Sequence, residues 1–162
     1  MANERAAIAL TAAEVDALLR AARTLVLVTI GPDGLPHPVP MWYCVDQGGT
    51  VWMRTYAASQ KVRNLERDAR FSALVEAGDR YDELRGAQLS GTVAVVDDVD
   101  TICEVVAGLL VRYEGLDPAH TDAVKAAYRP RAAKQRALRL EVAQVVSWDH
   151  RKQSAPGHGA LG

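Results

Sequence analysis

Three alternating prolines constrain the fold of this chain more than any other feature. Pro36, Pro38 and Pro40 follow the sequence Gly-Pro-Asp-Gly at 31–34, which is a strong turn signal between two strands. The preceding run, residues 24–30, is almost entirely β-branched or leucine and predicts a buried strand. Because proline cannot donate a ladder hydrogen bond, the strand that contains the prolines must lie at a sheet edge or face a ligand. The two segments therefore predict a hairpin whose second strand is an edge.

Strand-like segments continue along the rest of the chain, with helical segments between them. We predict strands at 24–30, 35–46, 50–55, 70–76, 84–96 and 138–148. We predict helices at 11–23, 59–68, 99–113 and 118–137, the last one interrupted by Pro130. Gly86 and Gly91 lie inside the fifth strand and indicate a bend with a bulge. Six strands that pair mostly as hairpins predict an α+β domain whose sheet closes into a small barrel.

Length, charge and cysteine content exclude several classes of protein. The 162 residues suffice for one domain, predicted at 1–152, followed by a mobile C-terminal tail at 153–162. A net charge of −1 argues against a general binder of nucleic acid or membrane surfaces. The chain has neither an apolar run of membrane-spanning length nor a signal-peptide core after its first residues, so we expect a cytoplasmic protein. Cys44 and Cys103 are expected to be free thiols, and the four histidines lack the spacing of metal ligands.

A strand–helix junction at 53–65 predicts a binding site for an anion. Ser59 is a favoured N-cap residue at the start of the predicted helix. A helix start presents free backbone N–H groups and the positive end of the helix dipole. Arg54, Lys61 and Arg63 add positive charge around that point. In the alternative interpretation, Ser59 is only a cap and the three cations are solvated surface residues.

These features together resemble the pyridoxamine 5′-phosphate oxidase-like split β-barrel superfamily of flavin and deazaflavin proteins. The resemblance covers residues 25 to 152. It rests on four segments: Ser-Gln-Lys-Val-Arg-Asn-Leu-Glu-Arg-Asp-Ala-Arg at 59–70, Gly-Leu-Pro-His-Pro-Val-Pro at 34–40, Gly-Asp-Arg-Tyr-Asp-Glu-Leu-Arg-Gly at 78–86, and Ser-Trp-Asp-His at 147–150. It is strongest to the actinobacterial branch that uses the deazaflavin coenzyme F420. The implied fold is a six-stranded antiparallel split β-barrel with flanking helices.

The resemblance implies that the phosphate end of the cofactor binds at the strand–helix junction. The phosphate-binding candidates are then Arg54, Thr55, Ser59, Gln60 and Lys61. The ring system is implied to lie against the second strand, with contacts from Pro38, Val39, Pro40 and Met41. Family members are usually homodimers that hold each cofactor between subunits, so Trp42 and Trp148 are candidates to line the pocket or the interface.

The implied activity is hydride transfer from reduced F420 to a small unsaturated or conjugated organic substrate. The alternative cofactor is flavin mononucleotide (FMN), bound by an oxidase of the pyridoxamine-phosphate type or by a non-catalytic carrier of flavin or haem. The deazaflavin coenzyme carries a lactyl phosphate and a glutamate tail, which favour further cations near the mouth of the site. Candidates for these cations are Arg129, Arg131, Lys134, Arg136 and Arg139, although a solvated helix face explains them equally well.

No residue is assigned a catalytic role from the sequence. Tyr81, Arg85 and His150 are the candidates to donate or orient a proton. Their alternative roles are loop packing for Tyr81, ion pairing for Arg85 and a surface position for His150. His37 either faces the cofactor ring or, as we expect, is a polar residue on an exposed strand face.

Overall fold

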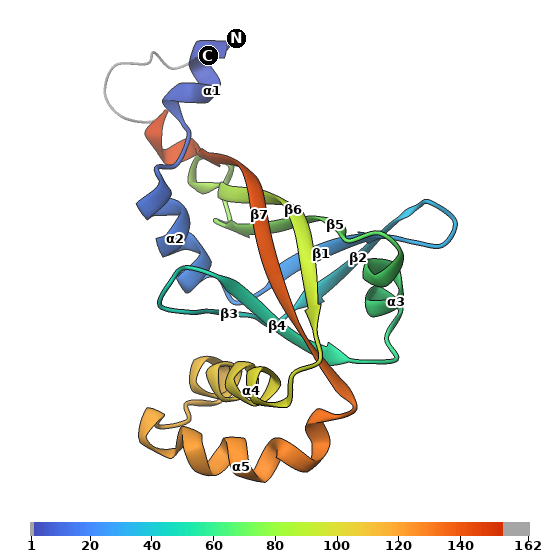
Figure 1. Ribbon diagram of the computed structural model, residues 1–162. Coiled ribbons are helices and arrows are strands. Elements are labelled where there is room, and N and C mark those ends of the chain that lie inside the picture. Colours follow the sequence, from blue (N-terminus) through green and yellow to red (C-terminus); the bar gives the residue numbers. More distant parts are fainter. Residues whose placement is uncertain (1, 154–162) are drawn as a thin grey trace.

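The computed structural model describes residues 2–153, which form one curled, seven-stranded antiparallel sheet with flanking helices (Figure 1). The strands are β1 Leu25–Ile30, β2 Pro36–Met41, β3 Cys44–Val45, β4 Val51–Tyr56, β5 Arg70–Ala77, β6 Arg85–Val96 and β7 Gln135–Asp149, in the sheet order β2-β1-β5-β6-β7-β4-β3. The α-helices are α1 Ala2–Ala7, α2 Ala12–Ala21, α3 Gln60–Arg67, α4 Val99–Glu114 and α5 Thr121–Ala132. Short 3-10 helices cover Tyr81–Glu83, Pro118–His120 and His150–Lys152. The predicted α+β class is confirmed, and the tail from residue 154 lies outside the described residues.

The strand count is seven and not six, because the second predicted strand is divided. β2 pairs with β1, whereas β3 pairs with β4. At Trp42 and Tyr43, between β2 and β3, the chain changes its partner strand from β1 to β4. β2 and β3 therefore form the two ends of the sheet, so the sheet is a half-barrel instead of a closed barrel. The edge position predicted from the prolines is confirmed.

The predicted boundary between the last helix and the last strand is wrong. α5 runs through Pro130 and ends at Ala132, and β7 begins at Gln135, not at residue 138. Pro130 lies in the last turn, where the loss of one helical hydrogen bond is tolerated. The alternating pairs that Gln135 and its successors make with β4 outweigh the helix propensity of the Ala-Ala-Lys-Gln-Arg-Ala segment, since tertiary pairing overrides propensity.

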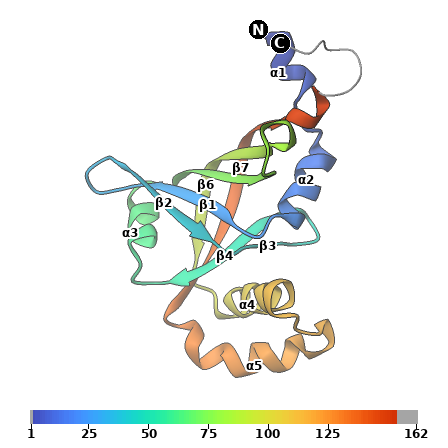
Figure 2. The same cartoon turned by 180° about the vertical axis from the view of Figure 1, so that it is seen from behind.

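Two apolar clusters hold the sheet and helices together. The larger one fills the concave side of the sheet, where Leu27, Met53 and Leu138 are fully buried and α2 and α3 contribute Leu18 and Leu65. The smaller one joins the α4–α5 pair to the outer face of β4 and β7. Figure 2 shows these two helices as a separate layer beyond β4. The two clusters therefore lie on opposite faces of β4, because neighbouring strand residues point to opposite sides.

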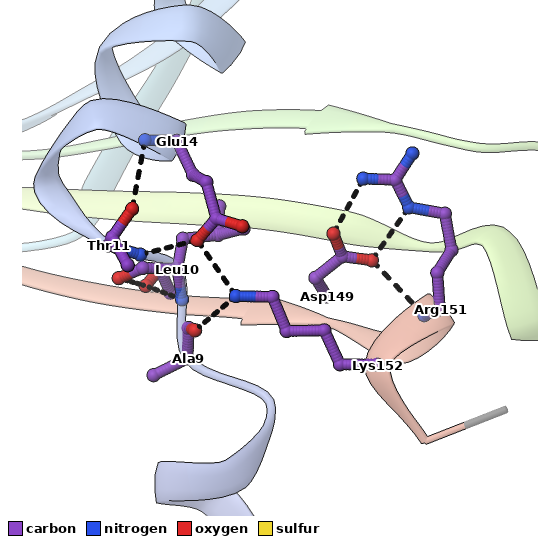
Figure 3. A network of polar contacts seen from close by, with 8 residues as sticks. Ala9, Leu10, Thr11, Glu14, Asp149, Arg151 and Lys152 are labelled. Carbon is purple, nitrogen blue, oxygen red and sulfur yellow. Dashed lines mark hydrogen bonds and ion pairs between the residues drawn. The ribbon is translucent and has the colours of Figure 1, made fainter. Parts of the chain in front are cut away.

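A polar network fastens the N-terminal segment to the end of β7 (Figure 3). Thr11 and Glu14 form the predicted capping box of α2, in which the Thr11 hydroxyl accepts from the Glu14 N–H and the Glu14 carboxylate accepts from the Thr11 N–H. Lys152 Nζ donates to the same carboxylate and to the Ala9 carbonyl, both at 2.8 Å. The Lys152 contact, followed by the Thr11 N–H, lowers the pKa of Glu14.

Candidate functional site

The predicted phosphate-binding residues of β4 lie on opposite faces of that strand. Thr55 shares the inner face with the core residue Met53, and its side chain is buried. Arg54 and Tyr56 point to the outer face, toward the layer formed by α4 and α5. The structure therefore separates Arg54 from Thr55, although the two are adjacent in sequence. We call the inner group, which comprises Thr55, Ser59 and Lys61, the inner junction.

The inner junction is a contiguous set of hydrogen-bonding groups. Lys61 Nζ donates to Thr55 Oγ1 at 3.1 Å, and Thr55 Oγ1 lies 3.3 Å from Ser59 Oγ. Ser59 occupies the N-cap position of α3, but its hydroxyl makes no capping hydrogen bond. The first N–H groups of a helix have no intrahelical acceptor. The junction thus combines two hydroxyls, one ammonium and free backbone donors, which is a suitable set for a phosphate group.

Lys61 carries the charge of the inner junction without an acidic partner. Its side chain is half-buried, and burial lowers the pKa of its ammonium group. Among the described residues, no carboxylate lies within ion-pair distance of Lys61. Burial of a cation costs free energy unless an anion compensates it. Lys61 is therefore a partly buried cation whose charge no described residue compensates.

Arg136 adds a second cation on the same face. It is the cross-strand partner of Thr55 in the β4–β7 ladder, and directly opposed residues of an antiparallel pair project to one side. Its Nη1 donates to the Gln135 carbonyl at 2.7 Å, and it forms no ion pair with the described residues. The sequence interpretation listed Arg136 only among possible cations for the cofactor tail, because it placed this residue in a helix. The signal that identifies it is the strand register.

A buried amide fixes α3 against the sheet. Asn64 is fully buried; its Nδ2 donates to the hydroxyl of Thr29 on β1 at 3.0 Å, and its Oδ1 accepts from Gln60 Nε2 at 2.9 Å. The side chain of Gln60 is thus engaged within the helix, which leaves its backbone N–H, in the first turn of α3, as its remaining donor. Val62 and Leu65 bury the apolar side of the same helix. This packing determines where the free end of α3 points.

Arg54 belongs to a second cationic region on the outer face of β4. Its Nη1 donates to the Oε1 of Gln135 at 3.1 Å. The region is a cleft of about 400 Å³ between β4 and the end of α5, lined in part by Arg54, Tyr56, Arg131 and Lys134. We call it the outer cleft. Of the five cations considered for the cofactor tail, Arg131 and Lys134 lie here, whereas Arg129 and Arg139 form ion pairs with Asp100 and Glu141.

The four predicted ring contacts on β2 also divide between two faces. Pro38 and Pro40 are exposed on the outer side, whereas Val39 and Met41 point toward the core, Met41 being buried. His37 shares the inner side, opposite Thr29. Its Nδ1 is buried and has no hydrogen-bond partner among the described residues. The expectation that His37 lies on an exposed face is therefore wrong.

An exposed, partly apolar row crosses the outer face of the sheet beside these prolines. The ladders place Pro40, Val26, Leu74, Gln88 and Val146 next to one another. Leu74 is 36% exposed and Val146 is 49% exposed. The exposed apolar residues of this row, interrupted by Gln88, are candidates for a contact surface.

The remaining candidates form local contacts. Trp42 is half-exposed and stacks on Tyr113, with 4.4 Å between ring centroids and an angle of 2°. The Trp148 ring packs directly against Gly86, where any side chain would collide with it. Tyr81 and His150 meet edge to face at 4.6 Å. Arg85 forms no ion pair within the described part of the chain.

Neither a metal site nor a membrane helix is found in the described part of the chain. Residues 2–153 contain no group of three or more His, Cys, Asp or Glu side chains that could hold a metal ion. None of their helices has both the length and the apolar character required to cross a bilayer.

Comparison with known proteins identifies the same architecture elsewhere. A family model described as pyridoxamine 5′-phosphate oxidase matches residues 11–149. The crystal structure of conserved hypothetical protein Rv2991 from Mycobacterium tuberculosis is 38% identical, with a TM-score of 0.83, and the match covers 98% of this chain and 96% of that chain. A search of curated proteins gave no significant match.

Two more distant solved structures are similar in fold alone. An F420 reductase is 22% identical with a TM-score of 0.59, and the match covers 80% of this chain and 94% of that one. The haem storage protein HutZ from Vibrio cholerae is 17% identical with a TM-score of 0.62, with coverage of 84% and 94%. Proteins with this fold thus differ in the cofactors that their names state.

Proposed function

Because this chain belongs to the pyridoxamine 5′-phosphate oxidase family, we propose that it is an oxidoreductase that binds coenzyme F420. Its substrate is a small unsaturated or conjugated organic molecule. The observation that carries the proposal is Lys61, a half-buried cation that contacts the Thr55 hydroxyl and has no acidic partner among the described residues. A phosphate group of the cofactor supplies the missing negative charge.

The charges and donors of the inner junction fit a phosphate. The lactyl phosphate of F420 is a phosphodiester with one negative charge, which Lys61 and Arg136 can compensate through charge-assisted hydrogen bonds. The hydroxyls of Thr55 and Ser59 and the first N–H groups of α3 provide neutral donors around these charges. Cation and helix start act together because both favour an anion at one point.

The protein's contribution to the reaction is binding and orientation. When bound in its reduced form, the deazaflavin supplies a hydride for an electrophilic carbon of the substrate. Lys61 and Thr55 hold the phosphate end. The outward-facing Pro38 and Pro40 give β2 an edge without N–H donors at these positions, which suits contact with a flat ring. Val39 and Met41 support that strand from the core side.

We also propose that the active form is a homodimer that encloses the cofactor. The exposed row through Val26, Leu74 and Val146 supports this, since such an apolar surface loses contact with water when a second copy covers it. The cofactor ring then lies in a site from which water is excluded, where electrostatic interactions are stronger. The partner chain thus completes a pocket that one chain leaves open.

The test is a titration of the purified protein with F420 and, separately, with FMN. Binding is monitored through the quenching of fluorescence from its three tryptophans. We expect tight F420 binding and weaker FMN binding. Replacing Lys61 with glutamine is expected to weaken F420 binding by about 1.5–3 kcal/mol, the range for hydrogen bonds to charged groups. Lys125→Gln is the matched control, because Lys125 already pairs with Glu104 and Asp122.

Three other results would change this conclusion. A preference for FMN would assign the protein to the oxidase or carrier class instead. If Lys61→Gln and Lys125→Gln lose F420 affinity equally, the loss reflects the general surface charge and not a specific contact of Lys61. Failure to bind either cofactor, with a circular dichroism spectrum that proves the protein folded, would overturn the proposal.

A further inference from the structure

The outer cleft is chemically distinct from the inner junction and has no role in the proposed function. It lies on the opposite face of β4, and its volume of about 400 Å³ falls within the range of about 300–1,000 Å³ that small-molecule sites occupy. Its lining combines three cations with two tyrosines, and it contains no acidic residue.

The cations of the outer cleft differ from two neighbouring cations because they form no ion pair with any described residue. Arg129, two residues before Arg131 on α5, pairs with Asp100, and Arg139, further along β7, pairs with Glu141 at 2.7 Å. Arg54, Arg131 and Lys134 form no ion pair within the described part of the chain. These two neighbours are therefore matched with an acid, whereas the three cations of the cleft are not.

The end of α5 explains only part of this positive charge. Basic residues in the last turn of a helix complement its dipole, whose C-terminal end is equivalent to about half a negative charge. Arg131 serves this role, since the helix ends at Ala132. Half a charge does not balance three cations, and Arg54 reaches the cleft from the sheet and not from the helix.

Gln135 holds Arg54 in place for a ligand. Gln135 is only 4% exposed, and its Oε1 accepts from Arg54 Nη1 at 3.1 Å. A neutral amide orients the guanidinium without cancelling its charge, as a carboxylate would do. Tyr56, directly opposite Gln135 in the ladder, is 64% exposed and presents its ring on the same face.

We propose that the outer cleft binds an organic phosphate with a planar ring, as a ligand separate from the cofactor. Three cations line the cleft, and they suit a multiply charged group such as a phosphate. The rings of Tyr56 and Tyr128 provide flat apolar surface for the remainder of the molecule, and aromatic rings favour stacked or edge-to-face contact. The cleft is too large for a bare phosphate ion and has room for such a ring.

The experiment compares phenyl phosphate, inorganic phosphate and phenol by calorimetric titration. We expect phenyl phosphate to bind most tightly, because only that compound uses both the cations and the tyrosine rings. The double variant Arg131→Gln/Lys134→Gln is expected to bind it at least about tenfold more weakly, since charge-assisted contacts are lost. Both residues are exposed, so this variant is expected to fold. Arg129→Gln is the matched control, with unchanged affinity.

Two further arms separate this site from the inner junction and from the cofactor. Lys61→Gln is expected to leave phenyl phosphate affinity unchanged, and saturation with F420 is expected to leave the ligand bound. Displacement by F420 would overturn the proposal in favour of the anionic end of the cofactor. If only Lys61→Gln loses phenyl phosphate affinity, the phosphate group of this compound binds at the inner junction and the proposal is overturned. An unchanged affinity in the double variant, or equal binding of phenyl phosphate and inorganic phosphate, would also overturn it. The titrations of the variants do not depend on whether F420 or FMN is the cofactor, and FMN replaces F420 in the saturation experiment if the protein binds FMN instead.

Discussion

The inner junction and the outer cleft lie on opposite faces of β4 and hold positive charge in different ways. Lys61 of the junction is half-buried beside two hydroxyls, whereas the cations of the cleft lie nearer to water around a buried amide. Two unit charges about 4 Å apart attract by about 4 kcal/mol at an effective dielectric constant of about 20, but by about 1 kcal/mol in bulk water. The junction is therefore the stronger anchor per cation, and the cleft compensates with a larger number of cations.

The largest difference between the two sites is expected when dimer formation is blocked. Replacing Leu74 with aspartate puts a charge in the centre of the exposed apolar row. The variant is expected to be monomeric by light scattering and to lose at least about tenfold in F420 affinity, because the partner no longer encloses the cofactor. The outer cleft is expected to keep its phenyl phosphate affinity, since α5 and β4 of a single chain build it.

Leu35→Asp is the control for this experiment. Leu35 is 63% exposed but lies in the turn before β2, away from the row. It is expected to change neither the mass of the particle nor cofactor binding. A Leu74→Asp protein that remains dimeric, or a monomer with full F420 affinity, would contradict the proposed interface.

Much of the scaffold was predictable because its signals are local. The turn at 31–34 and the capping box at Thr11 each depend on a few adjacent residues, and the structure has both. The irregularity predicted in the strand at 84–96 is present as a register shift beside Gly91, but its extra residue, Ala143, lies in the paired strand β7. The edge position of β2 followed from its prolines. The division of residues 35–46 into two strands was not predictable, because it depends on which distant strand each half meets.

The predicted phosphate-binding residues stay a prediction, but the sequence analysis did not show how the strand divides them between two faces. Strand alternation places neighbouring residues on opposite faces, and applying it to Arg54 and Thr55 would have separated them. The position of Arg136 opposite Thr55 depends on the pairing of β4 with β7, two strands far apart in the chain. The Ala-rich, Lys- and Arg-rich sequence before residue 138 favoured a helix there. Local propensity thus concealed both Arg136 and Gln135.

A comparison of Arg136→Gln with Arg54→Gln tests that assignment of faces. Arg136→Gln is expected to weaken F420 binding by about 1.5 kcal/mol or more, roughly tenfold, because it removes the second cation of the inner junction. Arg54→Gln is expected to leave F420 binding unchanged and to weaken phenyl phosphate binding instead. Tryptophan quenching and calorimetry measure the two affinities. The reverse pattern would place the cofactor phosphate on the outer face of β4.

The smallest expected effect is the pH dependence of ligand affinity, which differs between the two sites because one depends on lysine and the other largely on arginine. Burial lowers the pKa of Lys61, so its folded-state value lies below the ordinary lysine value of about 10.4. F420 affinity is expected to decline as pH rises through that lowered pKa, by at most about tenfold per pH unit. Phenyl phosphate binding at the outer cleft depends largely on arginine, which remains charged throughout this range.

The same pKa shift has the opposite effect on folding. In the window between the lowered pKa and the ordinary one, the unfolded chain binds more protons at Lys61 than the folded chain does, so the contribution of Lys61 to stability rises with pH there. Burial raises the pKa of Tyr43 to about 12 and that of Cys44 to about 11, so the unfolded chain loses these protons before the folded chain does, and the contributions of these two groups to stability fall as pH rises. Lys61→Arg keeps its charge and is expected to remove the alkaline decline in F420 affinity. If Lys61→Arg declines with pH as the wild type does, another group controls binding, and the uncompensated charge of Lys61 is not what the cofactor phosphate recognises.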